Sequence, residues 1–168
     1  MVSVDEALAR GKVSPEDACA LFDSLPSVTP EEMIGLWKGE SFDTGHPSDG
    51  QLLESGWFGK RFADDNTVDP LVFHTREGGT FPVDPRRAMA LMANGAYLPD
   101  VRSQCETTTS KARLRKIEHR GVVSTGMIYN ELPIIDNFRK VDENTLLGMM
   151  DNIELPGPPF FFIIRRHN

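Results

Sequence analysis

The pattern of hydrophobic and polar positions divides the chain into a helical start and a longer series of strands. Ser14-Pro15-Glu16-Asp17 and Thr29-Pro30-Glu31-Glu32 are typical of helix N-termini, with Ser or Thr as the N-cap and Pro at the first helical position. Apolar residues recur at helical spacing from Ala18 to Leu25, and Pro26 ends that pattern. The sequence therefore predicts short helices over residues 2–10, 15–25 and 30–36.

From Trp37 onward, alternating or apolar runs of strand length are separated by clusters of turn residues. The segment 84–110 stays open, because helix formers over Arg86–Met92 are followed by Asn94, Gly95 and Pro99, which break a helix. The pattern predicts strands over residues 37–42, 57–62, 71–74, 111–118, 122–129, 134–141, 145–151 and 160–166.

Short turns between these strands favour an antiparallel meander, and closing it into an up-and-down barrel removes the sheet edges. We expect a mainly β fold, with residues 1–29 as a helical segment packed on a single barrel domain of residues 30–168. Within that domain we expect two parts, residues 30–85 and 110–166, on either side of the open segment. A barrel of this size has room for one ligand in its interior.

Composition narrows the class of partner. The chain has 168 residues, 39% of them hydrophobic, and a net charge of −7, which argues against nucleic acid. Basic residues over 111–120 are interpreted as the solvated face of a strand, and no apolar run is long enough to insert into a membrane. Cys19 and Cys105 have no metal or redox spacing, and the N-terminus lacks the order of a signal peptide. These features predict a cytoplasmic protein and leave open whether it forms a homodimer.

Asp136 is the most informative polar residue of the second half. The period of two places it on one face of its strand with Ile134 and Phe138, so an inward apolar face would enclose a carboxylate. Such a carboxylate needs a partner. The candidate partners are Arg61, Arg113, Tyr129 and His46. The alternative, with Ile135, Asn137, Arg139 and Val141 inward and Asp136 in water, remains open.

Apolar and aromatic residues share one face of several strands, which favours a lipid-like or polyketide-like ligand with one polar end. His46 lies in the turn-rich loop 44–50, where a catalytic or ligand role competes with a simple turn role. The expected ligand-binding residues are Trp37, Phe58, Arg61, Arg113, Met127, Tyr129, Asp136, Phe138 and Phe162.

A cofactor-independent isomerase, cyclase or hydratase is the alternative function, with Asp136, His46 and Tyr129 as catalytic groups. The sequence contains no nucleophile elbow, no metal-binding motif and no glycine-rich phosphate loop, so we expect no metal and no cofactor.

Several separated motifs, in order, resemble a known family. Gly35-Leu36-Trp37-Lys38-Gly39, Thr44-Gly45-His46-Pro47 and Trp57-Phe58-Gly59-Lys60-Arg61-Phe62 resemble the GXWXG domain. Arg120-Gly121-Val122-Val123, Met127-Ile128-Tyr129, Pro133-Ile134-Ile135-Asp136 and Phe160-Phe161-Phe162 resemble the uncharacterised domain usually paired with it.

The first of these motifs is also similar to the start of calycin barrels, which include lipocalins, fatty-acid-binding proteins and haem-binding nitrobindins. That resemblance implies that Trp37 closes one end of the barrel beside Arg165 or Arg166. It also adds haem binding as a second alternative function, with His74, His119 or His167 as the axial ligand.

Overall fold

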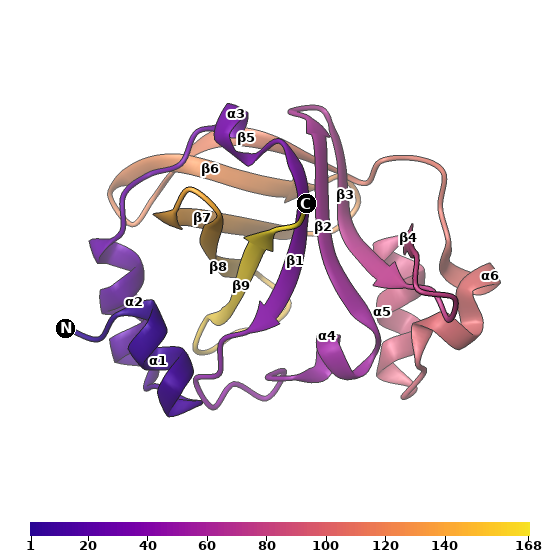
Figure 1. The fold of residues 1–168 in the computed structure, drawn as a ribbon, viewed down its shortest axis with the longest axis horizontal. Helices are drawn as coiled ribbons and strands as arrows, with labels where there is room; N and C mark the ends of the chain where they lie inside the picture. The colour runs from indigo at the N-terminus through magenta and orange to yellow at the C-terminus, as the bar shows by residue number, and fades with distance from the viewer.

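The structure is a computed structural model that describes residues 1–168, and strands dominate it (Figure 1). The strands are β1 (Gly35–Ser41), β2 (Trp57–Asp64), β3 (Thr67–His74), β4 (Thr80–Pro82), β5 (Ala112–His119), β6 (Val122–Tyr129), β7 (Ile134–Asp142), β8 (Thr145–Asn152) and β9 (Phe160–Arg166). The helices are α1 (Val4–Arg10), α2 (Pro15–Ser24), α3 (Pro30–Met33), α4 (Gln51–Glu54), α5 (Pro85–Ala93) and α6 (Arg102–Cys105), with a 3₁₀ turn η1 (Leu98–Val101).

All strand pairings are antiparallel, and they close into a ring. The order β2-β1-β9-β8-β7-β6-β5-β3-β4 is completed by pairing of β2 with β3, so only the short β4 lies outside the ring. Consecutive strands are neighbours, except that β4 does not pair with β5, and β9 returns to β1. The predicted mainly β, up-and-down barrel with short N-terminal helices is therefore confirmed.

One joint of the ring is much weaker than the others. β3 pairs with β5 only at Val68 and Ala112, and the far half of the same β3 edge pairs with β4 instead. The segment between β4 and β5 carries α5, η1 and α6, which lie together beside this joint (Figure 1). Here the sequence prediction was open, and the structure supplies a helix whose N-cap is Asp84 and whose first residue is Pro85.

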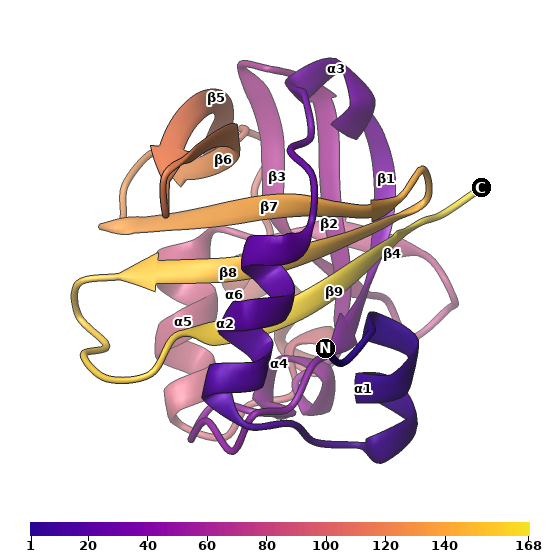
Figure 2. The same ribbon diagram turned by 90° about the vertical axis from the view of Figure 1, so that its left-hand side faces the viewer.

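The interior of the barrel contains most of the apolar core, and β9 also carries a second, outer core. Phe160, Phe162 and Ile164 belong to the interior cluster, whereas Phe161 and Ile163 belong to a cluster shared with α1 and α2. These two helices lie against the outside of the barrel over β8 and β9 (Figure 2). The division into a 1–29 segment and a 30–168 domain stays a prediction.

Trp37 fills the end of the barrel next to α3. Its side chain is fully buried, its indole Nε1 donates a hydrogen bond of 2.7 Å to the Met33 carbonyl, and the Arg166 guanidinium lies 4.4 Å from the ring centroid. Arg166 is anchored by donating to the carbonyls of Glu32 and Ile34 at 2.7 and 2.8 Å. Trp37 thus lies beside an arginine of the last strand, and of the two arginines considered this is Arg166, while Arg165 pairs with Glu40.

Glycine makes room for a second indole in this first strand. A Cβ on Gly39 would collide with the ring of Trp57, because that ring packs directly over the glycine. Gly59 has the same constraint for a different reason, since a Cβ there would collide with the Trp37 carbonyl on the paired strand. The glycines of β1 and β2 therefore allow both tryptophans to be buried in neighbouring strands.

β3 is longer than predicted. The sequence predicted a strand over 71–74, yet β3 begins at Thr67 and includes Pro70. The register between β2 and β3 shifts between Trp57 and Gly59, again across Lys60 between Gly59 and Arg61, and once more between Phe62 and Asp64. These bulges accommodate Pro70 and turn the side chains of Trp57 and Lys60 to the same interior face.

None of the helices has the length and apolar character needed to cross a lipid bilayer.

Candidate functional site

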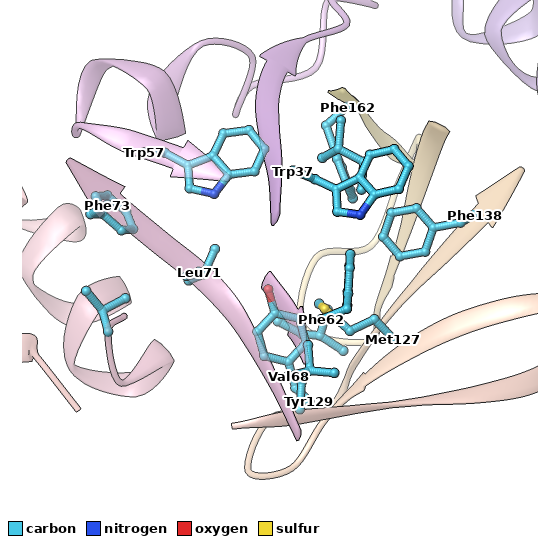
Figure 3. Close-up of a cluster of buried hydrophobic side chains, with 14 of the residues drawn as sticks. Trp37, Trp57, Phe62, Val68, Leu71, Phe73, Met127, Tyr129, Phe138 and Phe162 are labelled. Carbon is cyan, nitrogen blue, oxygen red and sulfur yellow. The ribbon is translucent and has the colours of Figure 1, made fainter. Parts of the chain in front are cut away.

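A cavity of about 770 Å³ opens at the end of the barrel opposite Trp37. Its rim is formed by α4, α5 with the residues that follow it, and the loop between β8 and β9. Of the 22 residues that line it, 14 are hydrophobic, so the wall is mainly apolar. Figure 3 shows part of this wall, with Trp57 and Leu71 on one side and Tyr129 on another.

A buried ion pair crosses the interior of the barrel. Lys60 comes from β2 and Asp136 from β7, and their Nζ and Oδ2 atoms lie 3.0 Å apart. Both side chains are 3% exposed, and Lys60 also donates a hydrogen bond of 2.9 Å to the Pro70 carbonyl. Both residues line the cavity, so a neutral pair of opposite charges lies in a mainly apolar wall.

Three aromatic rings surround the Lys60 ammonium group. Its Nζ lies 5.0 Å from the ring centroid of Phe162, 5.8 Å from Trp57 and 6.0 Å from Tyr129. The negative faces of aromatic rings attract a desolvated cation, which offsets part of the cost of burying it. The ammonium group is therefore held by one carboxylate, one carbonyl and a cage of rings.

Tyr129 adds an uncharged polar group to the same wall. Burial raises the pKa of the Tyr129 phenol well above its ordinary value, and the negative charge of Asp136 raises it further. The phenol therefore remains a hydrogen-bond donor at neutral pH. In Figure 3 the hydroxyl of Tyr129 points into the barrel interior, on the side of Leu71.

The comparisons with known proteins agree with this architecture. The family described as GXWXG protein matches residues 20–78, and a domain of unknown function (DUF4334) matches residues 110–166. A protein from Thermomonospora curvata with a crystal structure is 31% identical, with a TM-score of 0.74, and the alignment covers 98% of this chain and 96% of that one. The chain belongs to the GXWXG family. No curated protein matches it.

In this GXWXG protein, Asp136 points inward, which settles the alternative that the strand pattern left open. Asp136, Tyr129 and Phe162 all line the cavity. None of the residues predicted as charge partners, Arg61, Arg113 and His46, pairs with Asp136, because its cation is Lys60. The fourth predicted partner, Tyr129, lines the same cavity. A sequence signal for Lys60 existed: alternation places it on the same face as Phe62, as it places Asp136 with Phe138.

Three other expected ligand residues belong to the packed interior. Trp37, Met127 and Phe138 are fully buried but do not line the cavity. Phe138 packs edge-on against Phe162 with ring centroids 5.7 Å apart, and Met127 lies opposite Asp136 in the sheet register. These residues support the cavity wall from behind rather than facing its space.

The remaining expected ligand residues lie outside the barrel. The ring of Phe58 packs between His74 and His167, with centroids 5.2 and 5.1 Å away, because the bulge turns Trp57 inward and leaves Phe58 outside. Arg61 is exposed, and Arg113 donates a hydrogen bond of 2.7 Å to the Asn130 side chain. None of the three lines the cavity.

His46 also stays outside the cavity. Its Nδ1 accepts a hydrogen bond of 3.0 Å from the Ser48 backbone, and its ring packs on Phe160 at 5.4 Å. The side chain thus shapes the loop before α4, as the simple turn interpretation requires. It does not converge with Asp136 and Tyr129, so the proposed acid and base pairing through His46 is not formed.

The histidine ligation of haem that the nitrobindin resemblance implies does not fit this chain. None of its histidines lines the cavity. His74 and His167 pack on Phe58, and His119 packs on Phe22 of α2. Burial lowers the pKa of His74 and of His119, with the charge of Arg120 as a further cause for His119. The three histidines are therefore parts of packed outer surfaces.

Proposed function

We propose that this GXWXG protein binds a small, largely apolar molecule, lipid-like or polyketide-like, in the cavity at the α4 and α5 end of the barrel. The observation that carries the proposal is a mainly apolar wall with Lys60, Asp136 and Tyr129 gathered in it. A volume of about 770 Å³ lies within the range of small-molecule sites. Such sites combine apolar walls with a few polar groups that fix the ligand's orientation.

The energetics of the ion pair also favour a binding role. Protein interiors are close-packed, and a buried ion pair is often no more stabilising than apolar residues of similar volume. A cavity that contains both a large space and a charged pair is therefore poorly explained by stability alone. Recognition of a ligand gives both features a purpose.

Two substitutions on α5 test the proposal with a matched control. Ala93 lines the cavity and Ala90 does not, while both are exposed on the same helix. We expect Ala93→Trp to weaken binding of an apolar fluorescent dye by about tenfold or more, because the indole takes up space at the rim. Ala90→Trp should bind the dye as the unmodified protein does.

Native mass spectrometry of gently purified protein provides an independent readout of the same site. A co-purified small molecule should be retained by Ala90→Trp and lost from Ala93→Trp. Equal dye affinity for the two variants, or no binding of any apolar probe to the unmodified protein, would reject the proposal.

A cofactor-independent enzyme is the second candidate function, and it is favoured by one observation: Asp136, Tyr129 and Lys60 line the same cavity. In this scheme the Asp136 carboxylate accepts a proton from the carbon next to a ligand carbonyl. Tyr129 and Lys60 donate hydrogen bonds to the carbonyl oxygen as negative charge develops on it. The proton then returns to the opposite face of the same carbon, or to the far carbon of a conjugated enolate, and either step gives an isomer.

Solvent exchange separates this enzyme from a binding protein. A ketone that the protein binds is incubated with it in D₂O, and deuterium at the carbon next to the carbonyl is measured by mass spectrometry. Catalysis predicts exchange that Asp136→Asn abolishes while the ketone still binds. If deuterium exchange is no faster with the protein than in buffer, the enzyme function is contradicted and the binding function remains.

A further inference from the structure

We infer that the polar end of the ligand is an uncharged oxygen group, a ketone or an alcohol, and that the cavity discriminates against carboxylates and amines. This inference rests on the proposed function, because it specifies the class of molecule that the proposed site selects. It follows from the charge balance of the cavity and from the hydrogen-bonding capacity left free in its wall.

The charge balance comes first. Three charged residues line the cavity: Glu54, which is exposed on α4 at the rim, and the buried pair Lys60 and Asp136. The deep part of the cavity therefore has no net charge. A ligand carboxylate would place a second anion beside Asp136, with Lys60 as the one cation shared by both. A ligand amine would place a second cation beside Lys60, with Asp136 as the one anion shared by both. Uncompensated charge in an apolar site is strongly disfavoured.

The free hydrogen-bonding capacity comes second. An ammonium group has three donors; Lys60 donates one hydrogen bond to the Pro70 carbonyl, and its Nζ lies 3.0 Å from Asp136 Oδ2 in the ion pair. No protein group hydrogen-bonds to Asp136 Oδ1 or to the Tyr129 hydroxyl, and neither atom is among those sealed inside the protein without a partner. The wall thus offers two donors, from Lys60 and Tyr129, and one acceptor, Asp136 Oδ1.

These free groups match an uncharged oxygen. A ketone oxygen accepts two hydrogen bonds, which Lys60 and Tyr129 are able to supply. An alcohol accepts hydrogen bonds in the same way and donates its own hydrogen to Asp136. A wholly apolar ligand would leave these polar groups without partners when it displaced water, at a cost that a ligand oxygen removes.

Matched probes test the inference. A dodecyl series (2-dodecanone, 1-dodecanol, dodecanoate and dodecylamine) and a naphthalene series (2-acetylnaphthalene, 2-naphthylmethanol, 2-naphthoate and 2-naphthylmethylamine) are titrated by calorimetry at pH 8. The carboxylates and amines carry their charges at this pH. We expect the ketone and the alcohol of a series to bind about tenfold or more tightly than its charged members.

Two variants show whether the charge pair causes this preference. Asp136→Asn keeps the shape and leaves Lys60 as an unpaired cation, so the carboxylate should become the tightest member of its series. Tyr129→Phe serves as the control, because it removes one donor without changing charge. It should weaken the ketone and the alcohol while the carboxylate remains disfavoured.

The outcomes separate the inference from the proposed function. If the carboxylate binds the unmodified protein as tightly as the ketone, or if Asp136→Asn leaves the order of the series unchanged, the head-group assignment is wrong while the cavity remains a binding site. If no probe of either series binds, the proposed function itself is contradicted.

Discussion

Replacing Lys60 by Met measures what the buried ion pair contributes to the fold. The substitution keeps an unbranched side chain of similar length but leaves the Asp136 carboxylate, 3% exposed, without the cation that lies 3.0 Å from it. Removing one member of a buried pair typically costs about 3–5 kcal/mol, because the remaining charge has no partner. For a protein of this size, that loss lowers the melting temperature by about 10 °C.

Urea unfolding followed by tryptophan fluorescence measures this loss, since Trp37 and Trp57 are both buried in the barrel. Lys38→Met is the matched control, because Lys38 is exposed on the neighbouring strand β1 and its loss should change stability by less than about 0.5 kcal/mol. The double variant Lys60→Met with Asp136→Leu should recover most of the stability. If Lys60→Met changes the free energy of unfolding no more than Lys38→Met does, an unpaired Asp136 carboxylate costs nothing at this buried position and the reasoning is refuted.

Two further substitutions test other parts of the structure. Gly39→Ala should destabilise the protein by about 1–3 kcal/mol and change the fluorescence of Trp57, because the added methyl group collides with that indole; an unchanged unfolding midpoint in urea would contradict the packing. The hydrogen bond from Lys140, followed by that from the Thr29 backbone, lowers the pKa of Glu32 to about 2. This contribution to stability is present above the ordinary pKa of a glutamate and is lost as the pH falls toward 2. Since the Glu32 side chain is 41% exposed, Glu32→Gln should cost at most about 1 kcal/mol at pH 7, and its unfolding midpoint should converge on that of the unmodified protein in acid.

Local signals were sufficient for most of the fold. The helix starts at Ser14 and Thr29 lie where the capping residues place them, and the turns between β5 and β9 separate the strands as predicted. The same signal was present at Asp84-Pro85, where the later helix breakers obscured it. The segment after that helix is held by contacts with distant parts of the chain: Leu98 donates a backbone hydrogen bond to the Ser55 carbonyl, and the side chains of Leu98 and Cys105 belong to the interior apolar cluster.

The site was less predictable, because it depends on register. Alternation identified Asp136 as a buried candidate but allowed either face, and the strand pairing decides between them. In β2, alternation from Phe62 correctly places Lys60 inward, but the register shift between Trp57 and Gly59 then turns Trp57 inward instead of Phe58. The periodicity of one strand does not reveal such a bulge, because a bulge is defined by the pairing with the neighbouring strand. The cytoplasmic location, the absence of nucleic-acid partners and the question of a homodimer stay predictions, because they depend on molecules outside the chain.

The weak joint between β3 and β5 has a consequence for rates. In a closed ring of paired strands, a ligand enters and leaves the interior slowly unless part of the wall moves without breaking strand pairing. Here a single residue pair joins β3 to β5, and α5 covers the adjacent rim of the cavity. Met89 and Met92 of α5 line the cavity from that side, so their movement does not require any strand pairing to break. Substitutions of Met89 or Met92 should therefore change how long a ligand resides in the cavity, whereas substitutions at Lys60 or Asp136 should change which ligand is retained.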